Sequence, residues 1–167
     1  MSRIERRRIA RLVTVPSLAF FVTLIGCGSE PGPIVPVRLG GFPRHSSGMA
    51  SSVRETIRDP TRWASIWFDL VSREYPVRPV PRIDFGRQMV LLAALGERPS
   101  GGFSVSIEHV AVSDTGPGLT VHTRSTAPGQ NCIRTLTMTQ PVDAVLVPRL
   151  NCSVQFIEEN VVVDCSP

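Results

Sequence analysis

The sequence lacks the short motifs that mark the common enzyme classes. It contains no G-x-S-x-G nucleophile elbow, no H-E-x-x-H zinc motif and no phosphate-cradling glycine loop that opens a helix. Beyond residue 51 there are only two histidines: His122 on the polar side of a predicted strand, and His109 at a predicted β-bulge. The neighbouring carboxylates Glu158 and Glu159 point to opposite faces of a strand and cannot converge on one bond. We therefore predict a protein that is not an enzyme, with no catalytic residues, no metal site and no cofactor.

Lysine is absent, and most of the chain carries no net charge. The formal charge of +4 comes from the first 11 residues, which hold five of the 18 arginines and one of the 14 acidic residues. From residue 27 onward, 13 arginines face 13 acidic residues. This balance argues against the basic surface that nucleic-acid binding needs, so no nucleic-acid partner is expected.

The N-terminus has the pattern of a bacterial export signal over residues 1–26. A basic segment ends at Arg11, and residues 12–25 are apolar apart from three hydroxyl side chains. Such a run covers about 21 Å as a helix, which is short of a hydrocarbon core of about 30 Å. The run ends in Leu24-Ile25-Gly26-Cys27, which resembles the lipobox of bacterial lipoproteins. The resemblance implies that Cys27 is lipidated and anchors the protein to a membrane. Gly28, in place of an Asp, favours the outer membrane or cell surface over the inner membrane.

The rest of the chain divides into a tether and one domain. Residues 27–51 are rich in Gly, Pro and Ser without a hydrophobic period, which predicts a flexible tether. Residues 52–167 are expected to form a single domain, in which a short extended segment precedes a helix over about 60–73, because Asp59-Pro60 is a typical helix start. Apolar side chains at helical spacing give this helix one buried face: Trp63, Ile66, Trp67, Leu70 and Val71.

The remaining segments predict strands. The continuous apolar run 89–95 is typical of a strand covered on both faces, and residues 103–112 alternate until a phase slip at 108–109 indicates a β-bulge. Further strands are expected at 53–58, 119–125, 132–139, 142–147, 153–158 and 161–164. The fold class is therefore mainly β or α+β: a small antiparallel β-sandwich-like or barrel-like domain with one packed N-terminal amphipathic helix.

Three cysteines remain once Cys27 is assigned to lipidation. None are spaced as C-x-x-C and no histidine is close in sequence, which argues against a zinc site. An odd number leaves one thiol over, and two pairings are open. A bridge between Cys132 and Cys165 would stabilise the fold by about 3 to 4 kcal/mol in the chain-entropy model. A bridge between Cys132 and Cys152 is the alternative to it. A buried, reduced Cys152 is the simplest account of the third cysteine.

The order of motifs resembles the C-terminal domain of the protease complex subunit PrcB family. The matching parts are Ile83-Asp84-Phe85, the strand from Met89, the turn Gly96-Glu97-Arg98-Pro99-Ser100-Gly101-Gly102-Phe103, and Pro128-Gly129-Gln130-Asn131-Cys132. They are followed by Thr139-Gln140-Pro141 and Val145-Leu146-Val147-Pro148. The resemblance implies a small β-rich lipoprotein domain without catalytic residues, which associates with an exported protease as an accessory subunit.

The favoured function is therefore a lipid-anchored module that binds and stabilises an exported protein, with strand addition at a sheet edge as the expected mode. The candidate contact residues are Arg98, Pro99, Ser100, Gly101, Gly102, Phe103, Pro128 and Gly129. Alternatively, these glycines and prolines only build tight hairpins. Two other functions stay open. An envelope lipoprotein that binds a small molecule or cell-wall polymer would need an aromatic pocket, for which 6% aromatic residues is a thin supply. A peptidase inhibitor would present the glycine-rich turn to an active site.

Overall fold

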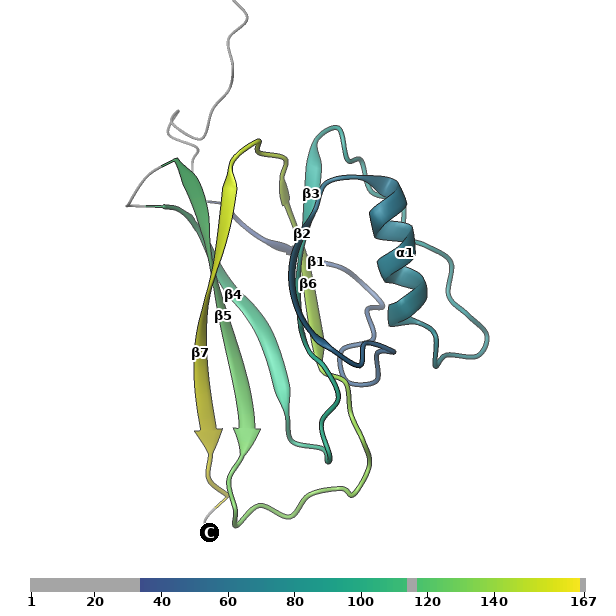
Figure 1. The fold of residues 1–167 in the computed structure, drawn as a ribbon, viewed down its shortest axis with the longest axis vertical. Coiled ribbons are helices and arrows are strands. Elements are labelled where there is room, and N and C mark those ends of the chain that lie inside the picture. The colour runs from purple at the N-terminus through teal and green to yellow at the C-terminus, as the bar shows by residue number, and fades with distance from the viewer. Residues whose placement is uncertain (1–33, 114–116, 166–167) are drawn as a thin grey trace, which may run out of the picture.

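The computed structural model describes residues 34–113 and 117–165 (Figure 1). The predicted export signal, Cys27 and the first residues of the predicted tether lie outside the described residues, as does most of the predicted turn at 114–118. In chain order the elements are β1 (Val37–Arg38), β2 (Ser52–Ile57), α1 (Pro60–Leu70), β3 (Gln88–Leu95), β4 (Ser104–Val112), β5 (Gly118–Pro128), β6 (Val142–Pro148) and β7 (Ser153–Val163). In this part of the chain no helix has the length and apolar character needed to cross a membrane.

The elements form three layers, with one sheet in the middle. The four-stranded sheet β1-β6-β3-β2 lies between α1 on one side and the three-stranded sheet β4-β5-β7 on the other (Figure 1). The described strands make a sandwich of two open sheets rather than a barrel. The strand pairs are antiparallel as expected except for one, because β5 and β7 pair in parallel. After β5 the chain crosses to the four-stranded sheet and forms β6. It then returns to the three-stranded sheet, where β7 runs in the same direction as β5.

Strand β3 is covered on both faces, as its continuous apolar run predicts. Val90, Leu92 and Ala94 belong to the core beneath α1, and the alternate residues from Met89 to Leu95 belong to the core between the two sheets. Successive side chains on a strand point to opposite faces, so an inner strand with a layer on each side must be apolar at every position.

Helix α1 begins as predicted and ends three residues earlier than the expected position 73. The Asp59 carboxylate accepts a hydrogen bond from the Arg62 amide at 2.8 Å, and Pro60 occupies the first helical position. Trp63 and Trp67 are buried, with ring centroids 5.5 Å apart. Both indole N–H groups donate to backbone carbonyls of the following segment, which satisfies the polar end of each ring.

The strand predictions hold except at the C-terminal side. The expected β-bulge lies between Ile107 and His109 in β4. The predicted strand 132–139 is wrong, because this segment forms the crossing between the two sheets and is an irregular loop. The strands predicted at 153–158 and 161–164 are one continuous strand, since β7 stays in register with β5 from Ser153 to Val163.

The predicted tether is wrong for residues 34–51, which pack onto the domain. Strand β1 pairs with β6, and the side chains of Phe42 and Met49 are buried in the core beneath α1. The Gly48 amide donates to the Leu70 carbonyl at 3.1 Å, at the end of the helix. Glycine and proline here allow close backbone contact rather than flexibility, a distinction that composition cannot make.

A buried carboxylate joins the two sheets. Asp143 of β6 is only 1% exposed and accepts a hydrogen bond from the Ile107 amide of β4 at 2.8 Å. The guanidinium of Arg38 lies 2.5 Å from the same oxygen, and that of Arg44 lies 3.7 Å from the other. Two residues of the predicted tether thus compensate the buried charge that fixes β4 against β6.

Candidate functional site

The predicted contact residues converge at one end of the sandwich. The turn between β3 and β4 and the loop between β5 and β6 lie together at the lower end of Figure 1, beside the C-terminus. Backbone hydrogen bonds join them: the Gly101 amide donates to the Thr135 carbonyl at 3.1 Å, and Arg98 and Thr139 exchange two bonds. The two segments that the sequence predicted as contact loops are therefore neighbours in space.

The glycine-rich turn has a packing role at this end. Gly102 has a φ of +90°, and a Cβ there would lie 3.0 Å from the ring of Pro128. A Cβ on Gly101 would lie 2.4 Å from the Thr135 hydroxyl oxygen. The Arg98 guanidinium lies over the Phe103 ring, 5.9 Å from its centroid. The glycines therefore let the turn press against the loop 129–141. The alternative of a tight hairpin is wrong for this turn, because β3 and β4 belong to different sheets.

The loop 129–141 presents apolar side chains to solvent that the sequence did not single out. Ile133 is 104% exposed, Leu136 95% and Met138 52%. We call these three residues the apolar tip. Because 132–139 has a strand-like pattern, sequence reasoning assigned its apolar residues to a sheet. The flanking Pro128-Gly129 and Pro141 were the available signal that this segment is a loop.

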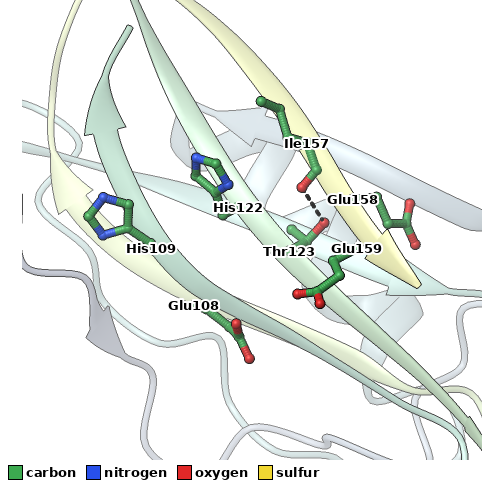
Figure 2. Close-up of a pocket in the computed structure, with 7 residues that line it drawn as sticks. All are labelled: Glu108, His109, His122, Thr123, Ile157, Glu158 and Glu159. Carbon is green, nitrogen blue, oxygen red and sulfur yellow. Dashed lines mark hydrogen bonds between the residues drawn. The ribbon is translucent and has the colours of Figure 1, made fainter. Parts of the chain in front are cut away.

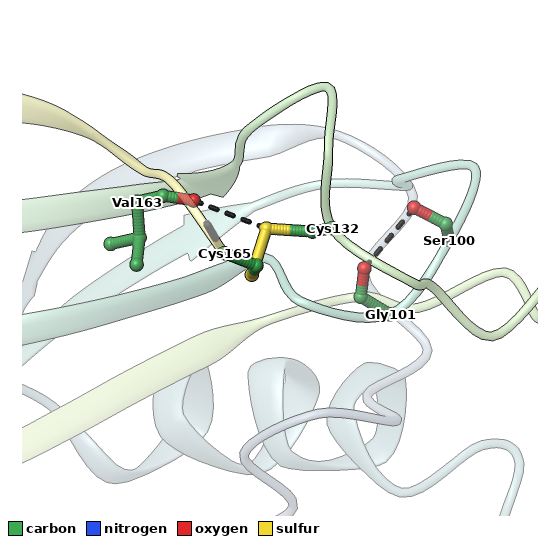
Figure 3. The surroundings of a disulfide bond; sticks show 5 residues. All are labelled: Ser100, Gly101, Cys132, Val163 and Cys165. Carbon is green, nitrogen blue, oxygen red and sulfur yellow. Dashed lines mark hydrogen bonds between the residues drawn. A yellow bond between two sulfur atoms is a disulfide. The ribbon is translucent and has the colours of Figure 1, made fainter. Parts of the chain in front are cut away.

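A disulfide fixes the base of this loop to the end of β7. Cys132 and Cys165 are bonded, which confirms that pairing over the alternative with Cys152 (Figure 3). The Gly129 amide donates to the Val163 carbonyl at 2.8 Å, which places the start of the loop against the end of the strand. Cys152 is not a free thiol either, so its interpretation as a buried, reduced cysteine is wrong.

A shallow groove of about 210 Å³ lies beside the turn and runs along β7. Its walls combine apolar and polar side chains, and it holds a single aromatic ring. The lining includes Leu95, Arg98, Phe103, Ser125, Glu158 and Val161. Within it the Glu158 carboxylate accepts hydrogen bonds from Arg54, at 2.8 Å, and from the Ser125 hydroxyl. A sugar or drug-like ligand would need a pocket lined by several aromatic rings, and this groove has only that of Phe103.

Comparison with known families agrees with this arrangement. Residues 89–148 match the family model described as PrcB C-terminal, and they contain β3 to β6 with both the turn and the loop. This segment is therefore similar to the C-terminal domain of PrcB. The match covers a little over a third of the chain, so β1, β2, α1 and β7 lie outside it. No curated protein and no solved structure matches the chain.

Strand β7 lies outside the matched segment and adds a long free edge to the sheet β4-β5-β7. It is the last strand of its sheet, spans 11 residues and contains no proline. Its outer backbone groups therefore have no strand partner among the described residues. Val162 and Val163, at the end that the disulfide ties to the loop, are exposed. An edge of this kind can accept an extended segment of another chain.

Several titratable residues lie on the outer face of the sheet β4-β5-β7 and in the groove. Glu158 points into the groove, whereas Glu159 bonds to Arg124 on the outer face, which confirms that these two carboxylates do not converge. The hydrogen bonds that Arg124 donates to the Glu159 carboxylate, together with the charges of Glu108 and Glu159, raise the pKa of the Arg124 guanidinium above its ordinary value. His109 and His122 lie on the same outer face (Figure 2).

Proposed function

We propose that this chain is a non-enzymatic, lipid-anchored module of the bacterial cell envelope, which binds and stabilises an exported protein as an accessory subunit of a protease complex. The observation that carries the proposal is the apolar tip, displayed on a pinned loop of the segment that is similar to the C-terminal domain of PrcB. The family resemblance supplies the class of partner, since its named member stabilises a secreted, surface-held protease.

The apolar tip is suited to contact with another protein. Each of Ile133, Leu136 and Met138 leaves apolar surface in water, which is unfavourable unless a partner covers it. The disulfide and the bonds to the turn hold the loop in place before any partner arrives. Binding then costs little conformational entropy, because the contact surface is already ordered.

The free edge of β7 gives the partner a second point of attachment. Addition of an extended segment would pair backbone groups that now have no strand neighbour, and the groove beside β7 would accept alternate side chains of that segment. The apolar tip and the edge meet at the disulfide, so one partner can contact both.

The proposed anchor is compatible with this arrangement. Six residues lie between Cys27 and Ile34, and the seven steps from one to the other can span at most about 25 Å. In Figure 1 the described chain starts toward the end opposite the loop 129–141. The domain would therefore lie close to the lipid surface with the apolar tip facing away from it, in an outer-membrane or cell-surface position.

The triple variant Ile133→Ser, Leu136→Ser, Met138→Ser tests the contact surface. We expect its recovery of an exported peptidase, purified with the full chain from native membranes and identified by mass spectrometry, to fall at least about tenfold. The three side chains are exposed, so the melting temperature should not fall by more than a few degrees.

The matched control is Phe68→Ser with Tyr75→Ser, which removes two exposed apolar side chains near α1 and should leave recovery unchanged. The peptidase level should also fall when this protein is deleted. Equal recovery by the triple variant, or the absence of a recurring partner, would contradict the proposal. Lower peptidase activity on addition of the protein would indicate an inhibitor instead.

Cys27→Ser tests the anchor separately. We expect the wild-type protein to partition into a detergent phase and its mature N-terminal peptide to begin at a diacylated Cys27, whereas the variant stays in the aqueous phase. Cys132→Ser is the control and should keep the lipid. An N-terminal peptide with an unmodified Cys27, or with Cys27 in a disulfide, would contradict lipidation without affecting the contact surface.

A further inference from the structure

Two histidines lie side by side on the outer face of the sheet β4-β5-β7. His109 of β4 and His122 of β5 are directly opposite each other in the ladder, and their ring centroids are 5.8 Å apart. Figure 2 shows the two rings adjacent on neighbouring strands, and both residues are exposed. Neither the family match nor the proposed function gives this pair a role.

The β-bulge is the reason that the rings meet. Upstream of it Ile107 pairs with Thr123, and downstream His109 pairs with His122, so Glu108 is the extra residue. Without the bulge the register would place Glu108 opposite His122 and turn His109 toward the inner face. Bulges are used in proteins to re-aim a side chain, and here the re-aimed side chain is an imidazole.

The separation of the rings suits a shared metal ion. A Zn²⁺ or Cu²⁺ ion bound at about 2.0 to 2.1 Å from a ring nitrogen lies about 3.2 Å from that ring's centroid. Two rings can therefore share one ion only if their centroids are within about 6.4 Å. The observed 5.8 Å meets this limit without any backbone movement.

The carboxylates near the pair are already engaged. Glu108 and Glu159 both lie within salt-bridge distance of Arg124, at 3.5 and 3.0 Å. Across residues 34–113 and 117–165, no group of three or more His, Cys, Asp or Glu could hold a metal ion. Protein ligation here is therefore limited to the two imidazoles, with water in the other positions.

We propose that His109 and His122 form a surface site for a divalent transition-metal ion that prefers imidazole ligands. Imidazole suits Cu²⁺ and Zn²⁺, whereas Ca²⁺ and Mg²⁺ require oxygen ligands, and the general order of stability places Cu²⁺ above Zn²⁺. The bound ion would connect β4 to β5 across their ladder and stabilise the folded sheet, because the pair is assembled only in the folded chain.

The test is a titration of the full chain in detergent micelles with CuSO₄ and, separately, ZnCl₂. His109→Ala and His122→Ala should each weaken the apparent Kd for either ion at least about tenfold, and Cu²⁺ should bind more tightly than Zn²⁺. Electron paramagnetic resonance of the Cu²⁺ complex should show two nitrogen ligands in the wild type and one in each variant. Saturating Zn²⁺ should raise the melting temperature of the wild type and leave that of either variant unchanged.

His45→Ala is the matched control, because this exposed histidine lies outside the pair. It should bind both ions as the wild type does. The melting temperatures without metal check that each variant is folded. Equal affinity of the wild type and the two variants His109→Ala and His122→Ala, or a Cu²⁺ spectrum that is the same in all three proteins, would overturn the site. Neither outcome bears on the apolar tip, which belongs to a different part of the molecule.

Discussion

Replacing both Cys132 and Cys165 by serine should lower the free energy of unfolding by about 3 to 4 kcal/mol. The two cysteines are separated by 33 positions, and their bond restricts the unfolded chain over that whole length. In the folded state the bond also holds the base of the loop 129–141 against the end of β7, where Gly129 bonds to Val163. Urea unfolding followed by tryptophan fluorescence measures the change, since both tryptophans are buried beneath the sheet.

Ile133→Ser is the control for the disulfide variant. It lies next to Cys132 in the same loop, its side chain is fully exposed, and its free energy of unfolding should stay within about 0.5 kcal/mol of the wild type. A loss of less than about 1 kcal/mol in the double serine variant would show that the bridge contributes little. The double variant should also bind the partner less well, because an unpinned apolar tip must be ordered on binding.

Gly48→Ala should lower the free energy of unfolding by about 3 kcal/mol, the largest loss that we expect from alanine at any of the described glycines. A Cβ at this position would lie 2.1 Å from the backbone carbonyl oxygen of Asp69 and 1.9 Å from the Ser72 hydroxyl. The serine can rotate away, but the carbonyl belongs to the last turn of α1 and cannot. The methyl group would therefore separate Gly48 from the helix and break its hydrogen bond to Leu70.

Gly40→Ala is the matched control for this prediction. It lies in the same glycine- and proline-rich segment, and a Cβ there would have no neighbour within 4 Å. Its free energy of unfolding should differ from that of the wild type by less than about 0.5 kcal/mol. If the segment were a flexible tether, both variants would be neutral. A neutral Gly48→Ala would thus contradict the packed arrangement of residues 34–51.

The candidate contact surface shows which features can be predicted from local sequence patterns and which cannot. The motif 96–103 and the Pro128-Gly129 pair belong to two segments that lie together at one end of the molecule, and the family match includes both. They did not identify the apolar tip, because Leu136 and Met138 alternate with threonines, which is the spacing of a strand with one face toward a core. Whether such a segment lies in a sheet depends on where its two ends are attached, and here they belong to different sheets.

The sequence by itself determined the elements whose signals are local. Asp59-Pro60 and the helical spacing from Trp63 to Leu70 specify α1, the apolar run 89–95 specifies an inner strand, and the phase slip at 108–109 specifies the bulge. Each of these depends on side-chain periodicity within about ten residues, which a single sequence displays directly.

Only the tertiary structure decided which segments meet. It gave β7 a parallel partner and a free edge, paired Cys132 with Cys165, drew residues 34–51 into the core and set His109 opposite His122. These contacts join residues far apart in the chain, and their stability comes from the burial and compensation that assembly creates. The carboxylate of Asp143 is the clearest case, since Arg38 comes near it only when β1 pairs with β6, and Ile107 only when the two sheets pack.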